Sequence, residues 1–469
     1  MEFILNNTKI TTNANPAMTL VDFIRENNNL KGTKIVCREG DCGACTVMVG
    51  ELNGTCDNVK YQTITSCISP LANAQGKHIV TVEGLNISNK LNNIQQEIKD
   101  NYASQCGFCT PGFVVAMVNY CLSDKTHTLQ QMLDAISGNI CRCTGYVAII
   151  NAAKKIVQDS HNNGKKFTLE QLIEKNFIPE YFLMISDKLK SIKTNRQTQK
   201  EEIVAGGTDL YVQQADNLAK KETLRFVVLE NKENIEFDNN QCSIAATCTV
   251  TDLFENKLLQ QKIENWQQYL RLLSSQAIRN MATIAGNFVN ASPIGDMSII
   301  LLALNANLEL FDGVSTREVL LKNFFIDYKK VNLNANEIIN KITFDLPTDT
   351  GFFNFEKVSK RKHLDIATVN TAIYLEFEKN IISSCRLSIG GVAAIPKYLS
   401  KTSKFLVGKA ILDDTIKQAI AIMHTEISPI SDVRGTDDYK RLLAENLLKA
   451  HFAMLNSKSK EIIQKNLQK

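Results

Sequence analysis

Cysteine is the residue type whose number and spacing in this chain point most directly to chemistry. The sequence holds 13 cysteines, ten of them within the first 143 residues, and the remaining three are Cys242, Cys248 and Cys385. No feature of the sequence supports export, and a reducing cytosol keeps thiols free. A set of cysteines this unevenly distributed therefore indicates metal binding rather than a disulfide framework.

The first group of four cysteines joins a C-x4-C-x2-C run to one cysteine that follows after 21 intervening residues; its members are Cys37, Cys42, Cys45 and Cys67. This is the plant-type ferredoxin arrangement for a [2Fe–2S] cluster. Gly40 and Gly43 would let the loop backbone lie close to the inorganic sulfides and donate N–H bonds to them. Tetrahedral zinc is the alternative, although zinc sites favour paired CxxC knuckles.

The second group combines a C-x2-C pair with a C-x-C pair after 31 intervening residues; its members are Cys106, Cys109, Cys141 and Cys143. Both pairs are expected at helix starts, where the helix dipole and free N–H groups stabilise a negatively charged cluster. This spacing is less specific than the first and, taken alone, leaves a zinc site open.

Two further segments suit a dinucleotide. The first is an apolar strand running into a Gly-Gly turn, whose paired glycines let the main chain approach a pyrophosphate; it comprises Ile203, Val204, Ala205, Gly206, Gly207, Thr208, Asp209 and Leu210. It is not a GxGxxG motif and does not indicate a Rossmann site. The second, at 279–296, gathers small and hydrogen-bonding residues, namely Thr283, Gly286, Asn287, Asn290, Ser292 and Asp296. A Gly-Gly turn is more often only a turn, so the second segment adds most of the weight.

The elements that must position these residues change in character along the chain. Residues 1–82 show short apolar alternation around the Asn6-Asn7 turn and helical spacing at 19–27, which predict a small β-rich domain. From 83 to 160 the spacing is helical, with helices expected at 94–98, 113–122, 129–137 and 146–157. A small helical domain is therefore expected to follow the β-rich one.

The remainder of the chain reads as α+β after a polar stretch. Residues 161–198 are charged and polar and are expected to be a connector, helical only around 169–173. A domain at 199–350 is expected to contain a helix over 252–272. The last domain, 351–469, is expected to have strands at 352–358, 371–377 and 386–389 and then helices from about 412.

Composition excludes several classes of protein. The formal net charge of +4 is spread along the chain, without the dense basic block that nucleic-acid binding would suggest. The N-terminus lacks the basic and apolar pattern of a secretory signal. The longest apolar runs, such as 298–304, fall short of the roughly 20 residues that a membrane helix needs. We therefore expect a cytoplasmic protein with no membrane partner.

The sequence motifs around the second cysteine group resemble those of a known protein family. QCGFCTPG at 105–112 and SGNICRCTGY at 137–146 resemble the iron–sulfur domains of the xanthine dehydrogenase and aldehyde oxidase family of molybdenum hydroxylases. The resemblance implies a β-grasp ferredoxin domain, a four-helix [2Fe–2S] domain, an α+β FAD-binding domain of the PCMH type and an α+β C-terminal flavoprotein domain. It also implies that Gln105 and Cys143 lie near a pterin. The other cysteines match no ligand position and are expected to be inert thiols.

The same family has an AGGT[DE] turn and a T[IL]GGN…SP..D stretch around FAD, and the two segments at 203–210 and 283–296 resemble them. Ala285 stands where the family has the first glycine of GGN, and its methyl group could crowd the flavin. KVSKR at 357–361 resembles a flavin-contacting region, which implies a contact from Lys357 or Lys360, although a solvated basic turn is the alternative. Leu273 and Ile339 match positions that line the flavin ring.

The resemblance implies an oxidoreductase: the electron-transfer subunit of a xanthine dehydrogenase. No catalytic residue is expected in this chain, since hydroxylation belongs to a molybdopterin-binding large subunit, in a dimer of heterodimers. Two [2Fe–2S] clusters would pass single electrons to FAD, and NAD+ would be the acceptor. Three alternatives stay open: a molybdenum hydroxylase for aldehydes or N-heteroaromatic substrates, a zinc-stapled scaffold without enzymatic activity, and a stand-alone reductase.

Overall fold

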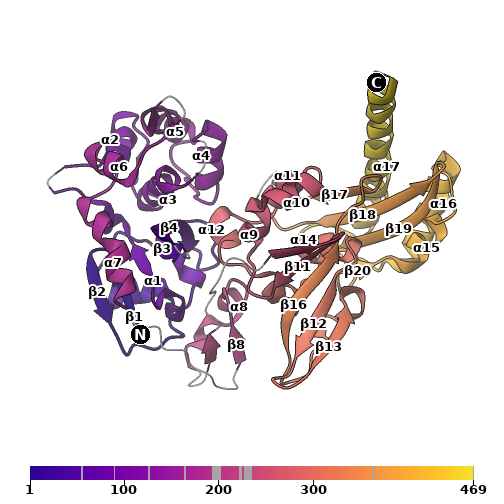
Figure 1. Ribbon diagram of the computed structural model, residues 1–469, viewed down its shortest axis with the longest axis horizontal. Coiled ribbons are helices and arrows are strands. Elements are labelled where there is room, and N and C mark those ends of the chain that lie inside the picture. Colours follow the sequence, from indigo (N-terminus) through magenta and orange to yellow (C-terminus); the bar gives the residue numbers. More distant parts are fainter. Residues whose placement is uncertain are drawn as a thin grey trace. The chain divides into compact units, whose positions relative to one another are not determined.

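The computed structural model describes residues 1–53, 56–88, 90–124, 127–162, 165–192, 202–220, 224–226, 235–361 and 364–467. The chain forms two compact units (Figure 1). Unit 1 consists of Met1–Val228 and Ser275–Ala282, and unit 2 of Leu229–Ser274 and Thr283–Lys469. The expected boundary between the connector and the next domain, at 198/199, lies outside the described residues.

Unit 1 begins with a five-stranded sheet in the order β2-β1-β5-β3-β4, in which β1 pairs parallel with β5 and the other pairs are antiparallel. Its elements are β1 (Glu2–Leu5), β2 (Thr8–Thr11), α1 (Leu20–Asp22), η1 (Phe23–Asn27), β3 (Thr46–Asn53), β4 (Cys56–Thr65), η2 (Ser66–Ile68), η3 (Leu71–Ala74), β5 (His78–Val80) and η4 (Val82–Leu85). The alternating apolar residues point into one buried core that includes Phe3, Leu20, Val47 and Ile79. The β-rich ferredoxin-like domain is confirmed.

Four helices follow, as expected: α2 (Asn93–Asp100), α3 (Thr110–Leu122), α4 (Leu129–Ile136) and α5 (Val147–Asp159). α2 and α4 each begin with a capping box, at Asn92 and Thr128, which satisfies free N–H groups of the first turn. α3 is buried almost all round and packs against β3 and β4 (Figure 1). The helical domain therefore shares a core with the sheet.

The segment expected as a polar connector carries β6 (His161–Asn162), β7 (Lys165–Lys166), α6 (Leu169–Glu174), η5 (Glu180–Met184) and α7 (Ile185–Lys190). Residues 163–164 and 193–198 of it lie outside the described part of the chain. Ile185 and Leu189 are buried against Ile4 of β1, and the Phe182 ring packs on His78. The helix at 169–173 is thus found, and α7 adds an apolar face that the charged residues around it obscured.

The rest of unit 1 comes from the region expected to bind FAD: β8 (Glu202–Val204), α8 (Leu210–Leu218), β9 (Leu224–Phe226) and α12 (Gln276–Arg279). β8 and β9 pair in parallel. Val204, Tyr211, Leu218 and Met281 belong to the same buried core as the ferredoxin-like sheet. These elements therefore fold on the ferredoxin-like domain.

Unit 2 contains a five-stranded antiparallel sheet in the order β10-β11-β16-β12-β13, flanked by short helices. Its elements are β10 (Ile235–Asp238), β11 (Gln241–Ala245), α9 (Val250–Glu255), α10 (Lys257–Lys262), α11 (Trp266–Arg271), α13 (Ile284–Asn290), α14 (Asp296–Ala303), β12 (Asn307–Phe311), β13 (Thr316–Leu320), η6 (Leu321–Asn323), β14 (Phe325–Asp327), β15 (Lys330–Val331) and β16 (Ile338–Asp345). The prediction of one helix over 252–272 is wrong. The chain breaks at Asn256, which caps α10, and at Asn265, whose φ is 60°.

The C-terminal part of unit 2 is a four-stranded sheet covered by helices: β17 (Phe352–Val358), β18 (Val369–Glu378), β19 (Ile381–Gly390), β20 (Lys397–Tyr398), α15 (Ser400–Leu406), α16 (Asp413–Glu426) and α17 (Asp437–Leu467). α14 is apolar and buried, and it packs against β18 and β19. The expected strands are confirmed, and the helices begin earlier than expected, at Ser400. Across the described residues, no helix has the length and apolar character needed to cross a membrane.

Candidate cofactor sites

The first four cysteines come together in unit 1, on the loop before β3 and on η2. Cys37 and Cys42 are half-buried, and Cys45 and Cys67 are buried. The Cys37 sulfur accepts a hydrogen bond from the backbone N–H of Glu39 at 3.4 Å. The side chains of Cys42 and Cys67 also bond to Cys37, and Cys67 bonds to Cys45. The fourth cysteine therefore reaches the other three although it is distant in sequence.

Hydrogen bonds among the four thiols shift their pKa values in opposite directions. Bonds from Cys42 and Cys67, with the Glu39 N–H, hold the pKa of Cys37 well below its usual range. Bonds to Cys37 and Cys45 raise the pKa of Cys67. Because cysteine binds iron as the thiolate, cluster loading would release the remaining protons.

Gly40 and Gly43 give the first loop its shape. Their φ angles are 75° and 67°, in the left-handed region that glycine adopts without strain. A Cβ at Gly40 would lie 2.5 Å from Cδ1 of Ile68, so the isoleucine side chain would have to move. The loop therefore needs glycine at both positions.

The second four cysteines gather in the helical part of unit 1 as two pairs. The Sγ atoms of Cys143 and Cys106 are 3.5 Å apart, and the side chains of Cys109 and Cys141 bond to each other. Cys109 is the N-cap of α3, as expected for a helix start. Cys141 and Cys143 instead lie in the loop before α5, which begins at Val147.

The two pairs differ in environment. Burial raises the pKa of Cys109 to about 12. The backbone N–H of Phe108 lowers the pKa of Cys106, and the Thr144 hydroxyl lies 3.2 Å from the Cys141 sulfur. Cys106 and Cys143 are exposed, whereas Cys141 is buried. One side of the second site thus faces the interior and the other faces solvent.

The loops of the two sites contact each other through the main chain. The Ile140 N–H donates to the carbonyl oxygen of Cys42 at 3.0 Å. Asn139 Nδ2 donates to the Gly43 carbonyl at 3.0 Å and is buried. A Cβ at Gly43 would overlap the carbonyl oxygen of Gly138 and lie 2.7 Å from Asn139 Nδ2. The two sites are therefore held together by backbone contacts beside their ligands.

Each site offers four thiols, the number of ligands that a [2Fe–2S] cluster takes. Within the described part of the chain, no group of three or more His, Cys, Asp or Glu side chains is placed to hold a single metal ion. The second site has two thiol pairs, and a [2Fe–2S] cluster takes four thiolates over two irons. A structural zinc site would require four thiolates closed around one ion.

The Gly-Gly turn lies in unit 1, between β8 and α8. A Cβ at Gly206 would overlap the Met281 carbonyl oxygen and lie 2.7 Å from its carbon. Gly207 has a φ of 79°, and a Cβ there would lie 3.1 Å from Pro70 Cδ. Asn73 Nδ2 donates to the Ala205 carbonyl at 3.3 Å. A glycine turn that leads into a helix provides main-chain N–H groups for a phosphate, although α8 is kinked at Gln214.

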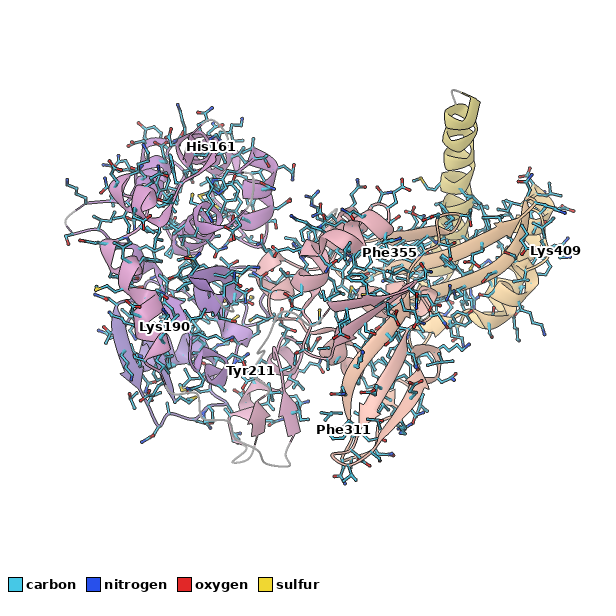
Figure 2. The ribbon with its side chains drawn as sticks, in the orientation of Figure 1. His161, Lys190, Tyr211, Phe311, Phe355 and Lys409 are labelled. Atoms are coloured by element: carbon cyan, nitrogen blue, oxygen red, sulfur yellow. The ribbon has the colours of Figure 1, made fainter. Side chains whose placement is uncertain are left out.

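The turn is anchored by residues on both sides. Val204 is buried in the ferredoxin-like core, and the hydroxyl of Tyr211, labelled in Figure 2, donates to the Ala17 carbonyl at 2.7 Å. The members of the segment that stay half-buried at its surface are Ile203, Ala205, Thr208, Asp209 and Leu210.

The second flavin segment lies in unit 2. Thr283 is buried and caps α13, where its side chain accepts a bond from the Gly286 N–H at 3.2 Å. Asn290 accepts from Lys329 Nζ at 2.6 Å through its side-chain oxygen. Asn287 and Ser292 are half-buried, as is Ala285, while Gly286 is exposed. The threonine therefore organises the helix start that presents the neighbouring polar groups.

Lys357 and Lys360 have different environments. Lys357 is buried, and its Nζ lies 2.7 Å from Asp296 Oδ2. Asn370 Nδ2 donates to the other Asp296 oxygen at 2.5 Å. Lys360 is exposed and donates to the Val433 carbonyl at 2.8 Å. Of the two lysines, Lys357 is the one joined to the segment at 283–296.

Leu273 and Ile339 are buried apolar residues of unit 2. Leu273 follows α11, and Ile339 lies in β16 opposite Leu310 of β12. Most of the predicted flavin residues therefore belong to unit 2, and only the segment 203–210 belongs to unit 1.

Four protein-family models match consecutive parts of the chain. They describe a 2Fe-2S iron-sulfur cluster binding domain at residues 3–72, a [2Fe-2S] binding domain at 81–154, an FAD binding domain in molybdopterin dehydrogenase at 185–347 and a CO dehydrogenase flavoprotein C-terminal domain at 355–455. The order and content of these matches decide the assignment.

The chain carries the iron–sulfur and FAD domains that occur in the molybdenum hydroxylase family.

Relatives of known identity agree with this assignment. Xanthine dehydrogenase of Emericella nidulans is 28% identical over 88% of this chain, and xanthine dehydrogenase/oxidase of Rattus norvegicus is 27% identical over 92% of it. The chain spans 35% and 37% of the length of these two proteins. A CO dehydrogenase structure from Oligotropha carboxidovorans has a TM-score of 0.50 at 24% identity, over 54% of this chain and 88% of its own. This likeness supports the fold.

The structure also shows residues near these sites that the sequence did not single out. Asn139 lies within the SGNICRCTGY motif, and its side chain donates a hydrogen bond to Gly43 in the first cluster loop. Asn370 lies 74 residues from Asp296 in sequence and supports that carboxylate from a neighbouring strand. Neither had a local signal, since each acts on a residue far along the chain.

Proposed function

We propose that this chain is the electron-transfer subunit of a xanthine dehydrogenase. It would take electrons from a molybdopterin-binding partner through the second and then the first cluster site to FAD and on to NAD+. The iron–sulfur and FAD domain matches support the electron-transfer role. Matches to proteins named xanthine dehydrogenase favour a purine substrate.

The observation that carries the proposal is the contact between the two cysteine loops. The Ile140 N–H donates to the carbonyl oxygen of Cys42. Cys42 is a cysteine of the first site, and Ile140 directly precedes Cys141 of the second site. When bound, [2Fe–2S] clusters exchange single electrons, and FAD exchanges one or two. The chain's own contribution is to hold the cysteine sets at a fixed separation and to shield Cys45, Cys67 and Cys141 from solvent.

For FAD, we propose that main-chain groups of 203–210 bind the diphosphate. The paired glycines lie in a strand-to-helix turn, where main-chain N–H groups can bind an anion, and this supports the contact. In unit 2, the proposed contacts come from the residues at 283–296, from Lys357, and from the apolar Leu273 and Ile339. Lys360 is not included, because its ammonium group binds the Val433 carbonyl on the surface.

The exposed side of the second site supports a partner there. Cys106 and Cys143 are exposed, and three apolar side chains of the same domain also face solvent: Tyr102 at 84%, Phe108 at 45% and Val147 at 66% exposure. Exposed apolar residues grouped on one domain are typical of a surface that another protein covers. We propose that the molybdopterin-binding partner covers this surface.

The function is tested with the full chain co-expressed with its partner and purified without oxygen. Four irons and one FAD per chain, with hypoxanthine-dependent reduction of NAD+, are the expected results. Turnover of aldehydes, N-heteroaromatic acids or CO instead of purines would reject the xanthine assignment only. A colourless chain that contains zinc and no flavin would reject the redox function altogether.

The partner surface is tested by replacing Tyr102 and Val147 together with serine. Partner affinity is expected to fall by at least tenfold, because such losses follow removal of central apolar anchors. The matched control is Val314→Ser, since Val314 is 94% exposed in unit 2. Equal affinity of both variants, measured by pull-down and calorimetry, would contradict the assigned surface.

A further inference from the structure

The segment Ser275–Ala282, which contains α12, belongs to unit 1 although the chain on either side of it belongs to unit 2. Ser275 is buried and caps the short helix, where its hydroxyl accepts a bond from the Ile278 N–H at 3.3 Å. Thr283, the next residue after the segment, caps α13 of the flavin region. The flavin-binding sequence thus contributes one short piece to the iron–sulfur unit.

α12 contacts the surroundings of the first cluster. A Cβ at Gly40, between Cys37 and Cys42, would lie 3.4 Å from Cδ1 of Ile278. The buried Asn280 donates from Nδ2 to the Thr63 carbonyl of β4 at 2.8 Å. The helix is therefore fixed to the strand that leads to the fourth cysteine and touches the loop that carries the other three.

The same segment contacts the other two sites. A Cβ at Gly138, three residues before Cys141, would lie 2.6 Å from Cβ of Ser275. A Cβ at Gly206 of the diphosphate turn would lie 2.7 Å from the carbonyl carbon of Met281. In both places glycine is the residue that leaves room for the segment. Eight consecutive residues thus touch the loops of all three sites.

We propose that α12 is a positioning element that sets the two cluster loops and the FAD diphosphate turn relative to one another. Ser275, Ile278 and Met281 are its contact residues. The inference rests on the cluster and FAD assignments of the proposed function. Because protein interiors are close-packed, a gap opened at one of these contacts shifts the neighbouring loops instead of being absorbed locally.

The test uses Ile278→Ala in the full chain. FAD affinity is expected to fall by about tenfold, within the range typical of coupled sites. The line shape of the first cluster's electron paramagnetic resonance signal is expected to change in the same variant. Ile278→Val should recover most of both properties. The matched control is Ile10→Ala, which removes a partly buried isoleucine from the same core but on the edge strand β2.

Equal FAD affinity and equal cluster spectra in the two alanine variants would overturn the inference. If Ile278→Ala does not fold, hydrogen–deuterium exchange of the unmodified chain tests the positioning role of α12. Removal of FAD is expected to speed hydrogen–deuterium exchange at 275–282 and at 38–43 as well as at 203–210. Faster exchange at 203–210 alone would overturn the inference. The proposed function would still hold in either case, since the unmodified chain would carry its iron and FAD.

Discussion

At the residue scale, the buried pair of Lys357 and Asp296 connects stability with flavin binding. The Lys357 side chain is 2% exposed and the Asp296 side chain 12%, and the charges are compensated by each other and by the Asn370 hydrogen bond to Asp296. Lys360, three residues further on, lies at the surface. Burial, rather than sequence similarity, distinguishes the two lysines.

Lys357→Met is therefore expected to destabilise FAD-free unit 2 by about 3–5 kcal/mol, the cost of leaving one buried charge unpaired. Lys360→Met should change the free energy of unfolding by less than about 0.5 kcal/mol. The free energy of unfolding of both variants is measured by urea unfolding, followed by the fluorescence of Trp266, the one tryptophan of the chain. The double variant Lys357→Met/Asp296→Asn should recover much of the loss, and no recovery would argue against the pair.

Gly43 tests the contact between the cluster loops. Gly43→Ala is expected to disturb both clusters, because its Cβ would overlap the Gly138 carbonyl. Gly145→Ala is the control, since Gly145 has a similar φ of 62° and nothing within 4 Å of the added Cβ. The control carries only the backbone strain of about 1–2 kcal/mol. Iron content and paramagnetic resonance spectra should be altered in Gly43→Ala and close to normal in Gly145→Ala.

At the element scale, α7 shows how a short amphipathic helix can be hidden in a polar stretch. Its charged residues alternate with Ile185 and Leu189, which pack on Ile4 of the first strand. The apolar face consists of too few residues to stand out from the lysines around it. The contact partner lies about 180 residues earlier, so only the folded chain reveals it.

Leu189→Ala is expected to destabilise unit 1 by about 2–5 kcal/mol, the usual cost of truncating a buried leucine. Lys190→Ala, one position further along the same helix, is exposed and should have almost no effect. The visible circular dichroism of the clusters, followed through urea unfolding, reports on unit 1. Equal midpoints for the two variants would show that α7 is not part of the fold's core.

At the scale of the whole molecule, both units contain a deeply buried histidine whose pKa is far below its usual value. Burial lowers the pKa of His78 in unit 1 and of His451 in unit 2 to about 3. His451 lies between Asn354 and Thr371, each 2.8 Å from one of its ring nitrogens. His78 is held by Tyr61 at 2.9 Å.

Both units are therefore expected to lose stability in acid. The unfolded histidine binds a proton below pH 6.5 and the folded one only near pH 3, so stability is full above pH 6.5 and falls as the pH drops below it. The loss between pH 7 and pH 5 should be about 2 kcal/mol per histidine. Urea unfolding of His451→Gln, followed by Trp266 fluorescence, should show lower stability at pH 7 and a flatter pH dependence than the unmodified chain. An unchanged slope would contradict this role of His451.

The sequence by itself determined the features that depend on neighbours along the chain. Cysteine spacing identified the two groups of four thiols, and the periodicity of apolar residues predicted the ferredoxin-like strands and the four helices, because both signals are complete within a few residues. The helix expected over 252–272 failed for the opposite reason. Asn256 ends α9, and Asn265, with a φ of 60°, precedes α11; apolar spacing does not register this local backbone geometry.

Only the tertiary structure decided which distant residues meet. It paired Cys106 with Cys143, selected Lys357 over Lys360 as the partner of Asp296, and placed α12 in the iron–sulfur unit. These outcomes depend on close packing between segments far apart in sequence. Such packing leaves no periodic pattern in the sequence, because a glycine or an asparagine at a contact cannot be distinguished in the sequence from one elsewhere.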